Sequence, residues 1–114
     1  MKTSHFLKKN ITTSQDLSSA ALSYTTTFAR KFKLEEVTIH FSQAVTELVT
    51  LTRDSAEGAN YDAVLATFNL VAETDFVFRP QGECNFQAGE NLKVQCTKAN
   101  AVGVAYVNIK TSEM

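Results

Sequence analysis

Two histidines and two cysteines are the side chains best suited to bind a transition metal: His5, His40, Cys84 and Cys96. Zinc sites in proteins usually take four such ligands in short, paired spacings. The spacings here match no common zinc pattern, and Cys96 lies in an alternating run that predicts a core position. No serine stands in a motif that would pair it with His40 as a nucleophile. We therefore predict structural or surface roles for these four residues, with no bound metal and no cofactor.

The segment DSAEGANYD collects oxygen-bearing side chains in one short stretch. Calcium loops need several oxygen ligands at close, regular spacing, whereas Asp54, Glu57, Asn60 and Asp62 are loosely spread and follow no EF-hand register. The simpler interpretation is that Asp54 caps or turns the loop and that Asp62 is paired locally. We expect Tyr61 and Asp62 to hold the loop through a buried hydroxyl or a carboxylate-to-backbone hydrogen bond. With no glycine-rich phosphate loop in the sequence, we predict no catalytic residue.

The overall composition is that of an ordinary folded domain. The chain has 114 residues, 44% apolar and 20% charged, with 11 basic and 12 acidic residues and a net charge of −1. Proteins that bind nucleic acid usually concentrate positive charge, and no apolar run here is long enough to span a bilayer. The start, MKTSHFLKKN, has lysines without an apolar segment after them, so we expect no signal peptide. We therefore expect no nucleic-acid partner, no membrane partner and reduced thiols, although a bridge between the two cysteines stays open.

Runs of alternating apolar and polar residues predict β-strands through most of the chain. LEEVTIHFS places Val37, Ile39 and Phe41 on one face, and LVTLT places Val49 and Leu51 on one face. The same period occurs in TDFVFRP, NLKVQCT and VGVAYVNIK, and turn residues cluster in RDSAEGAN, QAGEN and TKANAVG, with LVAETD as a weaker break. The eight phenylalanines are most simply core residues: Phe6, Phe28, Phe32, Phe41, Phe68, Phe76, Phe78 and Phe86.

The first third of the chain is rich in Ser and Thr, which disfavour helix interiors. We predict a strand over 24–28 and an edge strand or loop over 17–22. Residues 1–13 are expected to form either an edge strand or an extended N-terminal arm, and residues 14–114 a single domain.

The stretch GANYDAVLATFNL fits two periods at once. Tyr61, Val64, Leu65 and Phe68 have the spacing of an amphipathic helix, whereas every second residue from Val64 onward is apolar, as in a strand. Only about nine residues separate Gly58 from the next break, which makes a marginal helix. We therefore favour a strand.

Three pieces of the sequence, in this order, resemble a known family. They are FKLEEVTIHFS with LVTLTRDSAEGANYDAVLATFNL, then DFVFRPQGECNFQAGENLKVQCT, then KANAVGVAYVNIK. This order is similar to small β-sandwich proteins encoded among the head and tail genes of tailed bacteriophages, over roughly residues 32–110. The chain departs from the family pattern at Arg53, which is inserted before Asp54, and at Glu90-Asn91, where Gly-Asp is usual.

The resemblance implies a non-enzymatic virion protein, assembled in the host bacterial cytoplasm, and it also favours a strand for YDAVLATF. We expect an all-β fold: an antiparallel β-sandwich, jelly-roll-like or Ig-like, of roughly seven to nine strands with an N-terminal arm. The expected function is capsid decoration (a cement protein), with the major capsid protein or other virion proteins as partners and a homo-oligomer, a trimer being favoured. In the arm, Phe6, Leu7 and Ile11 are the expected interface residues. Two alternatives stay open: a tail, neck or fibre protein that contacts a host glycan, and a small metal-dependent enzyme on a jelly-roll scaffold.

Overall fold

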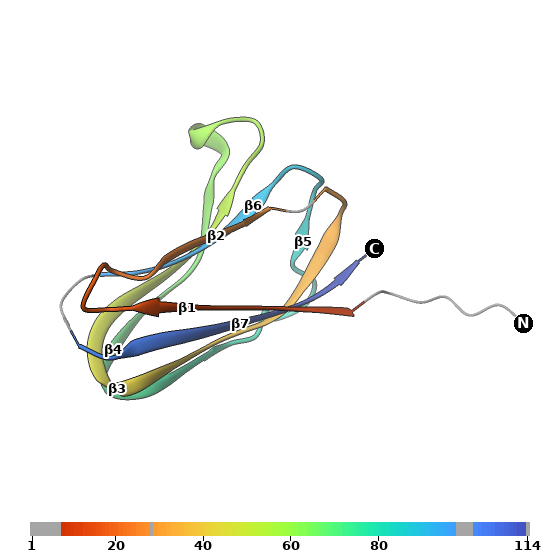
Figure 1. Cartoon of the computed structure of the whole chain (residues 1–114). Coiled ribbons are helices and arrows are strands. Elements are labelled where there is room, and N and C mark those ends of the chain that lie inside the picture. Colours follow the sequence, from red (N-terminus) through yellow and green to blue (C-terminus); the bar gives the residue numbers. More distant parts are fainter. Residues whose placement is uncertain (1–7, 28, 98–101, 114) are drawn as a thin grey trace, which may run out of the picture.

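The chain folds as an all-β, antiparallel, sandwich-like domain (Figure 1). The computed structural model describes residues 8–27, 29–97 and 102–113. The elements are β1 (Lys8–Asp16), β2 (Ser23–Thr27), β3 (Phe32–Asp54), the short 3₁₀ helix η1 (Ala59–Tyr61), β4 (Ala63–Phe78), β5 (Asn85–Phe86), β6 (Asn91–Cys96) and β7 (Val104–Glu113). The predicted fold class is therefore confirmed.

The long strand β3 organises the whole domain. Its first part pairs with β7, which pairs in turn with the edge strand β1, and its last part pairs with β6, which pairs with β2. Along its other side β3 pairs with β4 for most of its length and with β5 at its start. In Figure 1 the β3–β4 hairpin curves at the left of the view and leads from the lower layer to the upper one.

The bend in this hairpin comes from irregular pairing rather than from a break. His40 pairs with Asp75 and Val45 pairs with Glu73, so four residues of β3 stand opposite a single residue of β4. Beyond that point β4 carries a bulge, where Val71 and Ala72 stand opposite one residue of β3, and Ala72 adopts a φ of 52°. Such bulges bend and twist a strand without ending it. The break that we predicted at LVAETD is therefore wrong, because β4 runs through this segment.

The alternating runs place their apolar residues where the sequence predicts. Val37, Ile39 and Phe41 are buried in the first part of β3, and Val49 and Leu51 are buried in the last part. The inward-facing residues of β6 and β7 complete one core cluster between the layers: Leu92, Val94, Cys96, Ala105, Val107 and Ile109. The predicted strand over residues 24–28 corresponds to β2, although residue 28 is not described. The predicted strand over residues 61–68 is correct from Ala63 onward, because Tyr61 ends η1 instead. Residues 17–20 form a turn.

The phenylalanines divide into three groups. Phe32, Phe41, Phe76 and Phe86 are buried, Phe32 and Phe86 stack with 4.6 Å between ring centroids, and Phe78 is half-buried against the core. Phe6 and Phe28 lie outside the described residues. Phe68 is 45% exposed, so the prediction that it is a core residue is wrong. Its strand, β4, pairs only with β3. Among the described residues no strand pairs with the other edge of β4, so no neighbouring strand shields this side chain.

Candidate functional site

The outer edge of β4 is the longest free strand edge of the described part of the chain. β4 has 16 residues and pairs on one side with β3, and no other described strand pairs with it. It exposes Val64, Phe68, Val71 and Val77, with exposed fractions between 45% and 67%. Free edges offer unpaired backbone groups to other chains, and proteins usually protect them with lysine, proline or a covering segment. β4 contains no lysine, arginine or proline.

An apolar groove of about 490 Å³ opens beside this edge. Leu65 and Phe68 come from the first half of β4, and Phe78 comes from its end, so the bend in the strand brings the two halves together. The ring of Phe68 meets the ring of buried Phe76 edge-on, with 5.2 Å between centroids. The segment after β4 closes the groove with Arg79, Pro80, Gln81, Glu83 and Cys84. The exposed apolar side chains of the edge therefore lie beside a groove whose β4 side is apolar.

Acidic residues divide the β4 edge into two parts. Glu73 and Asp75 follow the bulge at Ala72, and both are exposed. Charges and bulges at a strand edge oppose pairing with another strand. The first half of β4, which carries Val64, Phe68 and Val71, is therefore the part best suited to contact a partner.

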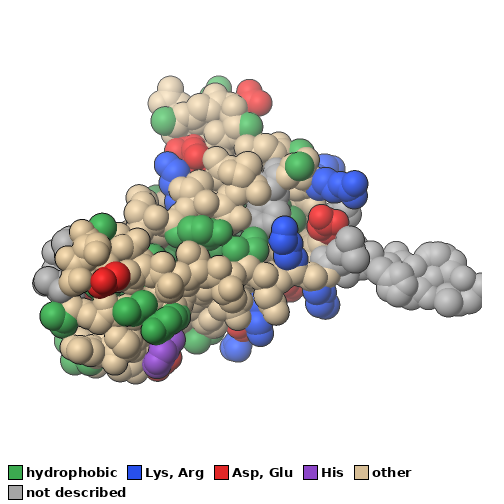
Figure 2. All heavy atoms as spheres, in the orientation of Figure 1, with side chains coloured by type: hydrophobic (Ala, Val, Ile, Leu, Met, Phe, Trp, Pro, Cys, Tyr) green, Lys and Arg blue, Asp and Glu red, His purple; other side chains and the backbone are tan. Residues whose placement is uncertain are grey.

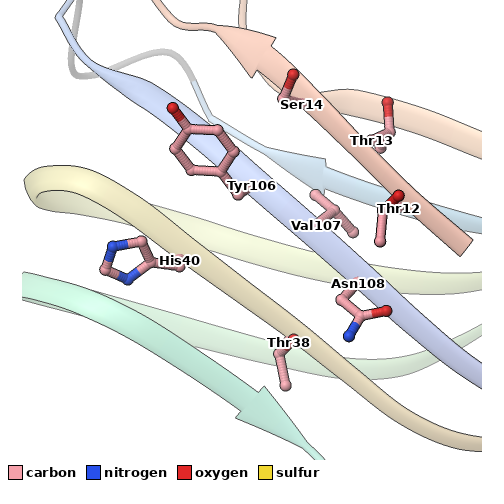
Figure 3. A pocket seen from close by; sticks show the side chains of 8 residues that line it. All are labelled: Thr12, Thr13, Ser14, Thr38, His40, Tyr106, Val107 and Asn108. Carbon is pink, nitrogen blue, oxygen red and sulfur yellow. The ribbon is translucent and has the colours of Figure 1, made fainter. Parts of the chain in front are cut away.

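A second groove, of about 530 Å³, lies on the outward face of β1, β7 and β3 (Figure 3). The strand register aligns its side chains in two rows. One row runs from β1 across β7 to β3 as Ser14, Tyr106 and His40, and the next row runs as Thr12, Asn108 and Thr38. Thr13 and Val107 also line the groove, from register positions between the two rows, and the Val107 side chain belongs to the core.

His40 forms a hydrogen bond with Asp75 across β3 and β4, with 2.8 Å between Nδ1 and Oδ1. This bond, with a second one from Thr74, lowers the pKa of the Asp75 carboxyl. Histidine paired with aspartate is two thirds of a catalytic triad, but no serine of the described residues forms a hydrogen bond with His40. The nearest serine in the same row, Ser14, is two strands away from His40, which is roughly 10 Å at the usual strand spacing. Because both partners are more than half exposed, the pair is a surface contact that fixes the imidazole.

The loop between β3 and β4 is held by a side chain of its own, and side chains from β6 hold the end of β3 beside it. Asp62 Oδ1 accepts a hydrogen bond from the backbone N–H of Ser55 at 2.8 Å, which confirms the predicted carboxylate-to-backbone bond. Asp54 Oδ2 accepts from the Asn91 amide at 3.1 Å and lies 3.9 Å from the Lys93 ammonium. Tyr61 is 68% exposed, so its hydroxyl is not buried as one of our alternatives proposed.

Both cysteines are free and buried. Burial raises the pKa of each thiol, and for Cys96, where the Glu47 carboxylate adds to the effect, to about 12. Across residues 8–27, 29–97 and 102–113 no group of three or more His, Cys, Asp and Glu side chains is placed to hold a metal ion. His40 lies on the surface, and His5 is outside the described residues.

The predicted interface residues fall partly outside the described chain. Phe6 and Leu7 lie in the segment that is not described. Ile11 is half-buried in β1, opposite Ile109 of β7, and packs against the core of its own chain. Residues 8–13 belong to β1, which continues to Asp16, so the boundary that we placed after residue 13 falls inside a strand.

Sequence reasoning missed both surfaces. The available signal for the outer groove was the second face of VGVAYVNIK, where Tyr106 and Asn108 alternate with core residues. The signal for the β4 edge was a 16-residue run without lysine, arginine or proline. Neither signal says which strands are neighbours, and both surfaces depend on that.

Comparison with known proteins adds no relative. No protein-family model matches the chain, and no curated protein matches it. Among the described residues, no helix has the length and apolar character needed to cross a membrane.

Proposed function

We propose that this protein is a structural, non-enzymatic component of a bacteriophage virion, most specifically a decoration or cement protein that bridges neighbouring capsid subunits. The observation that carries the proposal is the β4 edge, which joins a free strand edge to exposed apolar side chains. The resemblance of residues 32–110 to phage head and tail proteins gives the biological setting. The partners would be the major capsid protein or other virion proteins.

The proposed mechanism is burial of the β4 edge against a neighbouring subunit. A strand or extended arm of that subunit would pair with the backbone of residues 63–71, while Val64, Phe68 and Val71 contact its apolar side chains. Specific interfaces bury roughly 800 Å² on each partner. The β4 edge and the apolar groove beside it would contribute the desolvated centre of such an interface, where most binding energy is concentrated.

Residues 1–7 are a second contact that we propose. They precede Lys8, the first residue of the edge strand β1. They include Phe6 and Leu7, which we propose as anchors. Repeated display on a capsid favours a symmetric homo-oligomer, and we propose a trimer.

The test uses phage particles from the genome that encodes this chain. Mass spectrometry of purified particles should detect the protein in a fixed, high ratio to the major capsid protein, and immunogold labelling should place it on the head. Absence from heads would refute the decoration role, and absence from particles would refute the virion role.

Matched valine substitutions then test the β4 edge. Particles stripped of the protein are incubated with wild type, Val71→Lys or Val102→Lys, because Val71 is 67% and Val102 is 53% exposed. Val71→Lys should reduce occupancy at least tenfold, and Val102→Lys should not. A chain lacking residues 1–7, which keeps all of β1, should also bind more weakly. Equal occupancy for both lysine variants would rule out β4 as the contact edge.

A further inference from the structure

The groove on the outward face of β1, β7 and β3 is a separate surface from the β4 edge. Its volume, about 530 Å³, falls in the usual range for sites that hold a small molecule or a few units of a polymer. Three strands supply its residues, and their register is regular at this place. The side chains therefore stand on a rigid sheet, which makes the arrangement preorganised.

The lining combines hydroxyl and amide groups with a larger share of apolar surface, and it carries no permanent charge. Five of its eight residues are Thr, Ser or Asn, and none is Lys, Arg, Asp or Glu: Thr12, Thr13, Ser14, Thr38, His40, Tyr106, Val107 and Asn108. Hydroxyl and amide groups both donate and accept hydrogen bonds. A phosphate or carboxylate ligand would find no cation in this lining, whereas a ligand rich in hydroxyl groups would find a complementary surface.

Two rings form a platform at one end of the groove. Tyr106 is 50% exposed, and the His40 ring lies beside it with 6.4 Å between centroids and 23° between planes. Figure 3 shows both rings projecting to the same side from neighbouring strands. The hydrogen bond from His40 to Asp75 holds the imidazole in place. An exposed aromatic face binds the C–H face of a sugar ring, because that face is apolar while the hydroxyl groups lie at the rim.

Asn108 supplies an acceptor without a partner within the chain. Its Oδ1 is buried from solvent, and no described group donates a hydrogen bond to it. Buried acceptors of this kind are costly and are usually satisfied by a ligand or an ordered water. Figure 3 places the Asn108 side chain in the groove between Thr12 and Thr38, so a small turn of this side chain would bring its amide to a ligand hydroxyl.

We propose that this groove binds a neutral oligosaccharide. One sugar ring would stack on Tyr106 and His40, and the hydroxyl groups of the next would bond with Asn108 and the neighbouring threonines. A peptide in strand conformation is the less suitable ligand, because such peptides pair with strand edges, and this groove offers a sheet face. The site would give the protein an adhesive role toward a glycan surface, independent of any capsid contact.

The test is a binding measurement on the full chain with defined sugars. The probes are hexasaccharides of β1,4-glucose, α1,4-glucose and β1,4-N-acetylglucosamine, with a hyaluronan hexasaccharide as the anionic comparison. Isothermal titration and saturation-transfer NMR should detect at least one neutral hexasaccharide, with weaker or no binding of hyaluronan. Silence with all three neutral probes, or stronger binding of hyaluronan, would overturn the proposal.

Tyrosine variants assign the site. Tyr106→Ala should weaken binding of the neutral probe about tenfold, which corresponds to about 1.4 kcal/mol. Tyr61→Ala is the matched control, because Tyr61 is also exposed but lies in the β3–β4 loop. Asn108→Ala is the second test, in case Tyr106→Ala does not fold. If both groove variants bind like wild type, the ligand lies elsewhere and the assignment is wrong. Loss of glycan binding without loss of capsid occupancy would separate this proposal from the virion role.

Discussion

Replacing Thr97 with valine should destabilise the corner at which the long hairpin changes layers. The Thr97 hydroxyl donates to the Glu47 carboxylate at 2.6 Å and accepts from the backbone N–H of Leu48 at 2.9 Å. Glu47 is only 4% exposed, although its side chain is acidic. Valine has nearly the same shape as threonine and removes both hydrogen bonds, so the substitution isolates their contribution.

The expected loss follows from the two bonds. A hydrogen bond to a charged group contributes about 1.5–3 kcal/mol, and one between neutral groups about 0.5–1.5 kcal/mol. Thr97 is exposed, so water replaces part of what is lost, and we expect about 2 kcal/mol in the free energy of unfolding. In urea this corresponds to a midpoint lower by roughly 1 M.

The assay is urea unfolding followed by circular dichroism, at several protein concentrations because association would make the midpoint depend on concentration. Thr97→Ser is the control, because serine keeps the hydroxyl and should stay within about 0.5 kcal/mol of wild type. If Thr97→Val and Thr97→Ser have the same midpoint, the hydroxyl does not stabilise the corner and the reasoning is refuted.

Two further predictions concern titrating groups. Burial raises the pKa of Cys96 to about 12, so about one Cys96 thiol in 10⁴ is ionised at pH 8. A disulfide reagent should not label Cys96 until the chain unfolds, and rapid labelling of Cys96 in the native protein would contradict the described burial. The hydrogen bond from His40 lowers the pKa of Asp75 in the folded chain. Its contribution to stability is therefore present above the unfolded pKa and lost as pH falls through the lower folded value. Carboxyl NMR should show Asp75 titrating below its ordinary range, and His40→Ala should move the midpoint upward; an unchanged midpoint would show that the bond does not persist in solution.

The alternation of side chains was sufficient to predict the fold class. Val37, Ile39 and Phe41 face the core as their spacing indicates, and so do Leu92 and Val94. The reason is physical: a strand with one face buried must have a period of two, and the sequence displays that period directly.

What the sequence could not predict depends on which strands become neighbours. Phe68 has the spacing of a core residue, yet it is partly exposed because β4 ends the sheet. His40 and Asp75 are 35 residues apart, and only the pairing of β3 with β4 brings them into contact. The two rows of the outer groove likewise require the register of three strands.

The LVAETD segment shows the same limit locally. Its composition predicts a break, but the bulge at Ala72 lets the strand turn the corner and continue. A left-handed alanine costs about 1–3 kcal/mol, so neighbouring pairing must hold it in place. Turn propensity alone does not include the stabilisation that the neighbouring strand pairing provides.

The shared β3–β4 hairpin has a mechanical consequence. In a sandwich made of two independent sheets, the layers meet only through side chains and can slide or peel apart with the backbone ladders intact. Here the same two strands belong to both layers, so the layers separate only if the bent hairpin straightens or if the β3–β4 pairing breaks on one side of the corner. A force applied at the β4 edge would be transmitted along the chain to both layers at once, and the domain should unfold in a single step.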